Sequence, residues 1–131
     1  MSDGGAPFPI RFADIVFAHV LDPNGRNPKL RRVVVLTPDD ALAAGFPIVV
    51  AGVTGTLPVP LAADYVKLPY KNPPGRHPKT GLTKDAAVLC TWIVPIAPDD
   101  IHGRSGFVPP ALMAIVHSKT AAMARAVGGW P

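Results

Sequence analysis

The sequence contains neither Glu nor Gln, so all nine of its acidic residues are Asp. Mechanisms that need a glutamate base, including the HExxH helix of zinc proteases, are therefore excluded. A single cysteine, Cys90, excludes an internal disulfide and a cysteine-based zinc knuckle. No segment approaches the ~18 unbroken apolar residues of a membrane span, and residues 1–12 lack the pattern of a signal peptide. We expect a cytoplasmic protein with no membrane partner.

The chain has 131 residues, of which 48% are hydrophobic and 17% are charged. This length is typical of one domain with one core. The 17 Pro and 12 Gly make the sequence rich in turns, but it is too apolar for a disordered tail. We expect a single domain over residues 1–131 with its core at about 13–127.

The positive charge is concentrated in two short windows, 26–32 and 67–84, that contain no acidic residue. Their cations are Arg26, Lys29, Arg31 and Arg32 in the first window and Lys67, Lys71, Arg76, Lys79 and Lys84 in the second. Lys and Arg displace counterions from phosphates, and Tyr65 and Tyr70 offer faces for unstacked bases, so both windows suit RNA. The alternative is two solvated loops whose charge only keeps the protein soluble.

Five short runs rich in β-branched residues predict strands at 15–21, 32–37, 48–54, 65–68 and 86–96. Pro, Asn, Gly and Asp surround them, as is typical of turns. We expect the fourth run to be an edge strand and Pro95 to mark an end or an edge of the fifth. Several short strands with frequent turns indicate a small barrel or sandwich.

The last part of the chain has a helical period. Pro109 and Pro110 suit the start of a helix, and Gly128 and Gly129 suit its end. The stripe between them consists of Met113, Val116, Thr120, Met123 and Val127, widened by Leu112 and Ile115. We expect this stripe to pack against the core or against a second copy of the chain.

Several segments, in this order, resemble the MazF/PemK toxins, the mRNA-cleaving endoribonucleases of toxin–antitoxin modules. The matching strings are ADIVF at 13–17, DPNG at 22–25, RRVVVLTPD at 31–39, IVVAGVTGT at 48–56 and TGLTKD at 80–85. The likeness covers most of residues 13–127, the final helix included. It implies a mainly β fold, an SH3-like small barrel with a C-terminal α-helix. It also implies a homodimer, RNA in a groove at the dimer face, and an antitoxin whose extended acidic segment occupies the basic groove.

The resemblance also selects site residues, because Arg31 corresponds to the family's catalytic arginine and Thr54 to its active-site threonine. Cleaving RNA without metal or other cofactor requires the 2′-oxygen to attack the adjacent phosphorus while negative charge builds on the non-bridging oxygens. The permanently charged guanidinium of Arg31 suits that charge, and the Thr54 hydroxyl can donate to the same phosphate. We expect an endoribonuclease that cleaves single-stranded RNA.

We expect a histidine to take the proton from the 2′-hydroxyl, because imidazole titrates near neutrality. His77, in the second basic window, is the catalytic candidate, although simple solvation also explains it. His19 is the other, but strand alternation sets it on a face with Ile15 and Phe17, where a structural role is favoured. Four scattered histidines with no close pairing argue against a zinc site. Cys90, in an apolar run, is interpreted as a small buried hydrophobe.

The last predicted strand departs from the family, because it reads Thr91-Trp92-Ile93-Val94 where the family has an acid and a Gln. This departure favours a second interpretation, a non-catalytic module on the same barrel that binds RNA or a partner protein. Trp92 itself is expected in the core. A third interpretation is a structural or interaction domain without a nucleic-acid partner, which predicts no salt-sensitive affinity for RNA.

Overall fold

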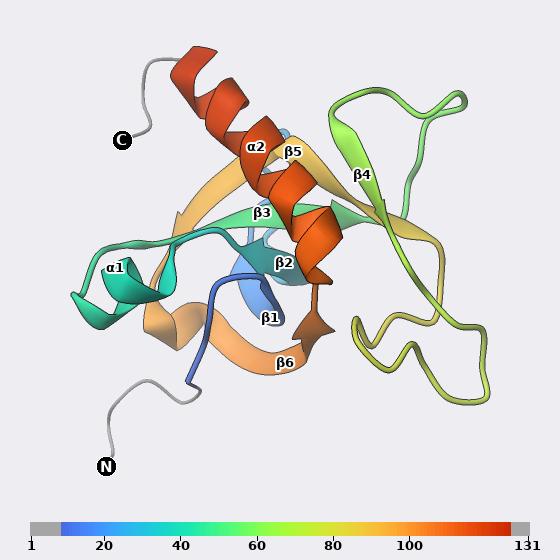
Figure 1. Cartoon of the computed structure of the whole chain (residues 1–131), viewed down its shortest axis with the longest axis horizontal. Coiled ribbons are helices and arrows are strands. Elements are labelled where there is room, and N and C mark those ends of the chain that lie inside the picture. Colours follow the sequence, from blue (N-terminus) through green and yellow to red (C-terminus); the bar gives the residue numbers. More distant parts are fainter. Residues whose placement is uncertain (1–8, 127–131) are drawn as a thin grey trace.

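The computed structural model describes residues 9–126 of the chain, with side chains up to residue 123. Six strands form one antiparallel sheet in the order β4-β5-β3-β2-β1-β6. The strands are β1 (Asp14–Val20), β2 (Lys29–Val35), β3 (Ile48–Thr54), β4 (Tyr65–Leu68), β5 (Ala86–Ile96) and β6 (Ile101–Phe107). Helix α1 (Asp39–Ala43) joins β2 to β3, a 3₁₀ turn (Pro98–Asp100) joins β5 to β6, and helix α2 (Pro110–Ala126) follows the last strand (Figure 1).

The mainly β fold with a C-terminal helix is confirmed. The sheet is strongly curved, as in a small barrel, but β4 and β6 are its two edges and do not pair with each other. The described part of the chain therefore forms an open sheet and not a closed barrel.

Three of the five predicted strands match the structure at both ends. β3, β4 and β5 begin and end at the predicted residues, and β4 is an edge strand as expected. β1 begins and ends one residue earlier than predicted, and β2 begins at Lys29 instead of Arg32. α1, the 3₁₀ turn and β6 are absent from the prediction.

The sheet packs a hydrophobic cluster against each of its faces. The cluster on the helix face, under α2, includes Ile15, Val34, Ala51, Val88, Cys90, Met113 and Val116. The cluster on the second face includes Val16, Ala18, Val33, Val50, Leu89, Trp92 and Ile101. Because side chains alternate along a strand, this division assigns the neighbouring residues of each strand to one face or the other.

Helix α2 covers the helix face with part of the predicted stripe. Met113, Val116 and Thr120 are buried, whereas Met123 is exposed. Ile115 is 45% exposed and does not widen the stripe. The last members, Val127, Gly128 and Gly129, lie outside the described residues. Neither helix within residues 9–126 combines the length and the apolar character needed to cross a bilayer.

Cys90 is fully buried in β5, which confirms its interpretation as a small hydrophobe. Burial away from water disfavours the thiolate and raises the pKa of Cys90 to about 11.

Candidate functional site

Arg31 and Thr54 lie on the neighbouring strands β2 and β3, just beyond the point where the pairing of these strands ends. The pairing of β2 with β3 ends at Val33↔Gly52, and continuing this register by two residues sets Arg31 opposite Thr54. Arg31 pairs with Ala18 of β1, which is buried in the second cluster, so the side chain of Arg31 belongs to that face. The two residues that the resemblance selects therefore lie at adjacent ends of neighbouring strands.

The guanidinium of Arg31 is held by two backbone carbonyls and an aromatic ring. Its Nε donates to the Val20 carbonyl at 3.3 Å and its Nη2 to the Asn27 carbonyl at 2.7 Å. Its Cζ lies 5.7 Å from the centre of the Trp92 ring, an arrangement that contributes about 0.5–2 kcal/mol. Of the guanidinium's five N–H donors, those not used in these two bonds have no hydrogen-bond partner among residues 9–126 and can donate to a ligand.

The loop between β1 and β2, residues 21–28, presents the Asn27 carbonyl and is organised by Asp22. The Oδ1 of Asp22 accepts the backbone N–H groups of Asn24 and Arg26, and its Oδ2 accepts the side-chain amide of Asn27, all at 2.9 Å. The backbone hydrogen bond from Arg26, followed by that from the Asn27 side chain, lowers the pKa of Asp22 below its usual 3.8. Asp22 therefore stays ionised at neutral pH and keeps the loop that supports Arg31 in shape.

Trp92 links β5 to the Arg31 site. Its ring lies on Gly52 of β3, where a Cβ would overlap three ring atoms, and its Nε1 donates to the Leu21 carbonyl at 3.2 Å. Trp92 is only 6% exposed, so the expected core position is confirmed. The contact of its ring with Arg31 was not predictable, because it depends on a shift in the β3–β5 register between Ala51 and Val53, and such a shift has no signature in the sequence.

A backbone N–H group just beyond the end of β3 orients the Thr54 hydroxyl. Its Oγ1 accepts the backbone N–H of Thr56 at 3.1 Å, which leaves the hydroxyl proton free to donate. Adjacent strands are ~4.8 Å apart, so a guanidinium and a hydroxyl opposite each other can reach two oxygens of one phosphodiester.

A lysine and a carboxylate extend the site along the second face. Thr54 pairs with Ala87 of β5, and Ala87 pairs with Lys67 of β4, so Lys67 lies in line with Thr54. The Nζ of Lys67 forms an ion pair with Asp85 at 3.0 Å. Asp85 precedes Ala87 by two residues, which by alternation sets it on the same face. Lys67, from the second basic window, and Asp85, the residue that follows this window, thus lie on the same face as Thr54.

Arg32 lies on the helix face, away from Arg31. It pairs with Phe17, its Cζ is 4.9 Å from the centre of the Phe17 ring, and its Nε donates to Ser105 Oγ at 3.2 Å. Partial burial lowers the pKa of Arg32, yet a guanidinium remains charged at neutral pH. The neighbouring arginines of the first window therefore act on different faces.

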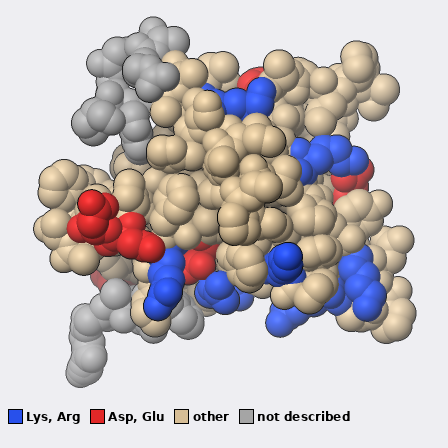
Figure 2. All heavy atoms as spheres, viewed as in Figure 1, with Lys and Arg blue, Asp and Glu red and all other residues tan. Residues whose placement is uncertain are grey.

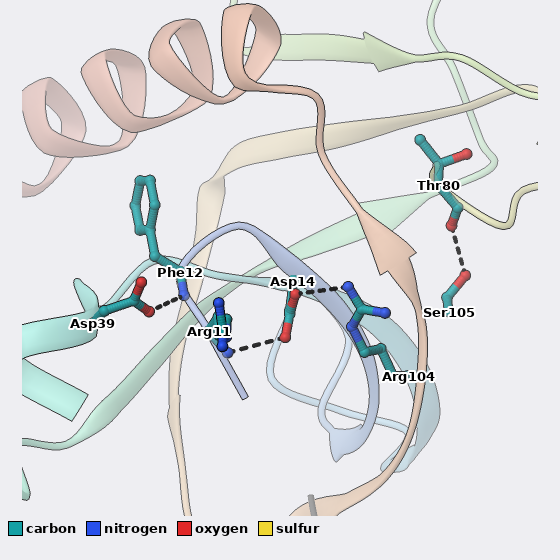
Figure 3. A network of polar contacts seen from close by, with 7 residues as sticks. All are labelled: Arg11, Phe12, Asp14, Asp39, Thr80, Arg104 and Ser105. Atoms are coloured by element: carbon teal, nitrogen blue, oxygen red, sulfur yellow. Dashed lines mark hydrogen bonds and ion pairs between the residues drawn. The ribbon is translucent and has the colours of Figure 1, made fainter. Parts of the chain in front are cut away.

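The loop between β4 and β5, residues 69–85, is docked on β6. Ser105 Oγ donates to the Thr80 carbonyl at 2.8 Å, a contact shown in Figure 3, and the Phe107 N–H donates to the Lys79 carbonyl at 2.9 Å. Gly81 makes the approach possible, because its φ of +74° suits glycine and a Cβ there would overlap the Ser105 carbonyl. The second basic window is therefore held in a defined place.

His77 belongs to the internal structure of this loop. It is partly buried, and its Nδ1 accepts the N–H groups of Lys79 at 3.2 Å and Thr80 at 3.3 Å. These contacts hold a turn and do not bring His77 to Arg31 or Thr54. Its role as the proton carrier stays a prediction.

The remaining predicted RNA-binding residues divide between the second face and the loops. Lys29 pairs with Val20, which is in the second cluster, and so shares a face with Arg31. The exposed loop cations are Arg26, Lys71, Arg76, Lys79 and Lys84. In Figure 2, Lys and Arg gather at the lower right, where Figure 1 draws the loop between β4 and β5, and Asp gathers at the left around α1.

His19 faces away from Arg31, because it pairs with Leu30 on the side of Phe17 and Ile15. Its Nδ1 lies 3.0 Å from the Nε2 of His102 on β6. The expectation that no two histidines are close is therefore wrong. It failed because the pairing of β1 with β6 joins residues that are 83 positions apart in the sequence.

An apolar hollow of about 660 Å³ opens at the other end of β3. Its lining includes Ile10, Leu42, Phe46, Ile48 and Ile96. Ile48 begins β3 and Thr54 ends it, which separates the two by ~20 Å along the strand. The hollow is therefore distinct from the Arg31 site.

No protein-family profile and no curated protein sequence matches the chain. Solved structures do match. "Mycobacterium tuberculosis toxin MazF-mt6" is 20% identical, with 86% of this chain and 96% of that chain covered and a TM-score of 0.63. MazF from Deinococcus radiodurans is 15% identical, with 90% and 98% covered and a TM-score of 0.68. An "endoribonuclease in complex with its cognate antitoxin from Mycobacterial species" is 16% identical, with 95% and 100% covered and a TM-score of 0.66. The chain has the fold of the MazF toxins.

Proposed function

We propose that this protein is a metal-independent endoribonuclease toxin that cleaves single-stranded RNA at the Arg31–Thr54 site and is neutralised by an antitoxin. The observation that carries the proposal is the anchored guanidinium of Arg31, with Thr54 at the end of the neighbouring strand and its hydroxyl accepting from Thr56 N–H. The fold adds support, because it is shared with proteins named as toxins and endoribonucleases.

In the proposed reaction the ribose 2′-oxygen loses its proton and attacks the adjacent phosphorus, and the 5′-oxygen of the next nucleotide leaves and takes up a proton from water. The products are a 2′,3′-cyclic phosphate and a 5′-hydroxyl. The free N–H groups of Arg31 and the hydroxyl of Thr54 donate to the non-bridging oxygens, where negative charge develops. Because Val20, Asn27 and Trp92 already hold the guanidinium, little reorganisation is needed when that charge appears. DNA lacks the nucleophile and is not cleaved.

Asp85 is the acceptor we assign to the 2′-hydroxyl proton. It lies on the same face as Thr54, its main-chain oxygen is 3.8 Å from the Cβ position of Gly55, and its carboxylate pairs with Lys67. His19 is on the other face, and the Nδ1 of His77 is occupied by two backbone donors. An Asp85→Asn variant keeps the shape and removes the base, so its cleavage rate should fall ~100-fold or more. A rate within a few-fold of the unaltered protein would return the role to His77.

We further propose that the toxin is a cytoplasmic homodimer and that the antitoxin covers the basic second face with an extended acidic segment. The acid-free windows that supply Lys29 and Lys67 are complementary to such a segment. Size-exclusion chromatography with light scattering should give twice the 13.7 kDa mass of one chain. A monomeric mass at working concentration would reject the dimer.

A non-catalytic RNA-binding module is the second candidate. It is favoured by Trp92, which stands where the family has Gln, and by the bonds of Arg31 to two backbone carbonyls, which also suit a structural arginine. This candidate predicts RNA that is bound but stays intact.

One experiment separates the two. Purified protein is incubated with single-stranded RNA, or with DNA of the same sequence, in EDTA, and the product ends are identified. The nuclease cuts only RNA and leaves 2′,3′-cyclic phosphate, and Arg31→Ala lowers the rate by at least ~100-fold. Salt-sensitive binding without cleavage establishes the module instead.

A further inference from the structure

The His19–His102 pair joins two neighbouring strands on the sheet face opposite to Arg31. The imidazole rings are nearly perpendicular, at 87°, with their centres 4.6 Å apart, and Nδ1 of His19 lies 3.0 Å from Nε2 of His102. Both side chains are exposed, so solvent and ions reach them. The nuclease proposal makes no use of either residue.

We propose that these two histidines chelate a first-row divalent metal ion, with Cu²⁺ and Ni²⁺ as the preferred ions. Neutral imidazole is the commonest protein ligand for such ions. His102 lies between the paired residues Ile101 and Gly103 of β6, and His19 follows Ala18, the partner of Ile101, so the paired strands hold both ligands in place before the ion arrives.

The separation of the two nitrogens allows one ion to contact both. With metal–nitrogen bonds of ~2.0–2.1 Å, two ligands at a right angle are ~2.9 Å apart, and two ligands at the tetrahedral angle are ~3.3 Å apart. The observed 3.0 Å lies within this range, so rotation of the rings can direct both nitrogens at one ion. Cu²⁺ and Ni²⁺ are preferred because the affinity of nitrogen sites for first-row divalent ions rises along the series to Cu²⁺.

The proton balance is simple. In the metal-free pair one ring donates the hydrogen between Nδ1 of His19 and Nε2 of His102. For both nitrogens to bind the ion, that proton moves to the other nitrogen of the same ring through solvent, and no net proton is released. No group of three His, Cys, Asp or Glu forms a metal site among the described residues, so water fills the remaining positions.

The test is titration of the untagged full chain with NiCl₂ and CuCl₂ by calorimetry, with thermal unfolding in parallel. We expect one ion per chain at micromolar concentration and a higher Tm, because an ion that joins β1 to β6 binds only the folded state. His19→Gln and His102→Gln should each weaken binding at least ~10-fold and abolish the rise in Tm.

His117→Gln is the matched control, because His117 is exposed on α2 and packs its ring against Phe12. It should bind as the unaltered chain does. The electron paramagnetic resonance spectrum of the Cu²⁺ form should show two coupled nitrogens. The proposal is overturned by the absence of binding up to millimolar metal, by a double His19→Gln/His102→Gln variant that binds as tightly as the unaltered chain, or by loss of binding in His117→Gln.

Discussion

At the scale of single residues, the candidate site depends on one close contact, that of Trp92 with Gly52. The ring rests where any Cβ at position 52 would be, and from there it meets Arg31 and the Leu21 carbonyl. Because Gly52 has no side chain, Trp92 can pack there and contact the charged side chain of Arg31.

Gly52→Ala should accordingly destabilise the protein by about 1–3 kcal/mol, because the methyl group must displace a buried indole. Urea unfolding monitored by tryptophan fluorescence measures the change. Gly55→Ala is the matched control, since a Cβ there meets only the Asp85 carbonyl at an ordinary 3.8 Å. Equal midpoints for the two variants would show that the ring does not rest on Gly52.

Cys90 provides a second prediction at this scale. Its folded-state pKa of about 11 exceeds the ordinary 9.0, so burial of the neutral thiol contributes stability in full below pH 9. That contribution is lost as the pH rises toward 11. Between these values the unaltered chain should therefore lose more stability than a Cys90→Ala variant. Parallel curves of unfolding free energy against pH for the two proteins would contradict this account.

At the scale of elements, β6 and the loop between β4 and β5 support each other. Ser105 accepts from Arg32 and donates to the Thr80 carbonyl, so one hydroxyl connects β2, β6 and the loop.

Ser105→Ala removes both bonds and should loosen the loop. Trypsin cuts after Lys and Arg, and Lys71 and Arg76 are exposed there, so we expect cleavage within residues 69–85 to be several-fold faster. Mass spectrometry of a trypsin time course checks the site and the rate. Ser118→Ala, at an exposed position of α2, should leave the rate unchanged. Equal rates for both variants would mean that Ser105 does not hold the loop.

Comparison of the predicted with the observed strands shows how much of the fold could be predicted from the sequence. β3 and β5 are predicted correctly because their apolar runs are continuous, as expected for strands buried on both faces. β6 carries Arg104 and two glycines, and only Ile101 and Gly106 are buried, so its sequence has no apolar pattern. It is a strand because β1 offers an unpaired edge.

The candidate site was predictable only in part. Arg31 and Thr54 come from the resemblance, and the structure shows that they lie on neighbouring strands, just beyond the paired residues of β2 and β3. The contacts of Trp92, the Lys67–Asp85 pair and the His19–His102 pair all depend on strand pairing between distant segments. The spacing of residues within one segment does not reveal which distant segment it pairs with.

At the scale of the whole molecule, the two basic windows are divided between the faces of the sheet. Lys29, Arg31 and Lys67 share the second face, whereas Arg32 lies on the helix face. Only part of the positive charge is thus in line with Thr54.

RNA affinity should therefore depend on which lysine is removed. Lys29→Gln should reduce the slope of log affinity against log salt by about 0.7, the contribution of one single-strand phosphate contact. Lys119→Gln is the matched control, because that lysine is on α2 and donates to the Ala63 carbonyl. Fluorescence anisotropy at several salt concentrations measures both slopes. An equal reduction of the slope in the two variants would show that RNA binding is not confined to the second face of the sheet.

The most direct measurement compares two adjacent arginines. Arg31→Ala and Arg32→Ala remove the same charge one residue apart, but from opposite faces of β2. With folding verified by circular dichroism, the rate of RNA cleavage at saturating substrate should fall at least ~100-fold in Arg31→Ala and stay within a few-fold in Arg32→Ala. Equal losses, or a loss confined to Arg32→Ala, would contradict a phosphodiester site at Arg31 and Thr54.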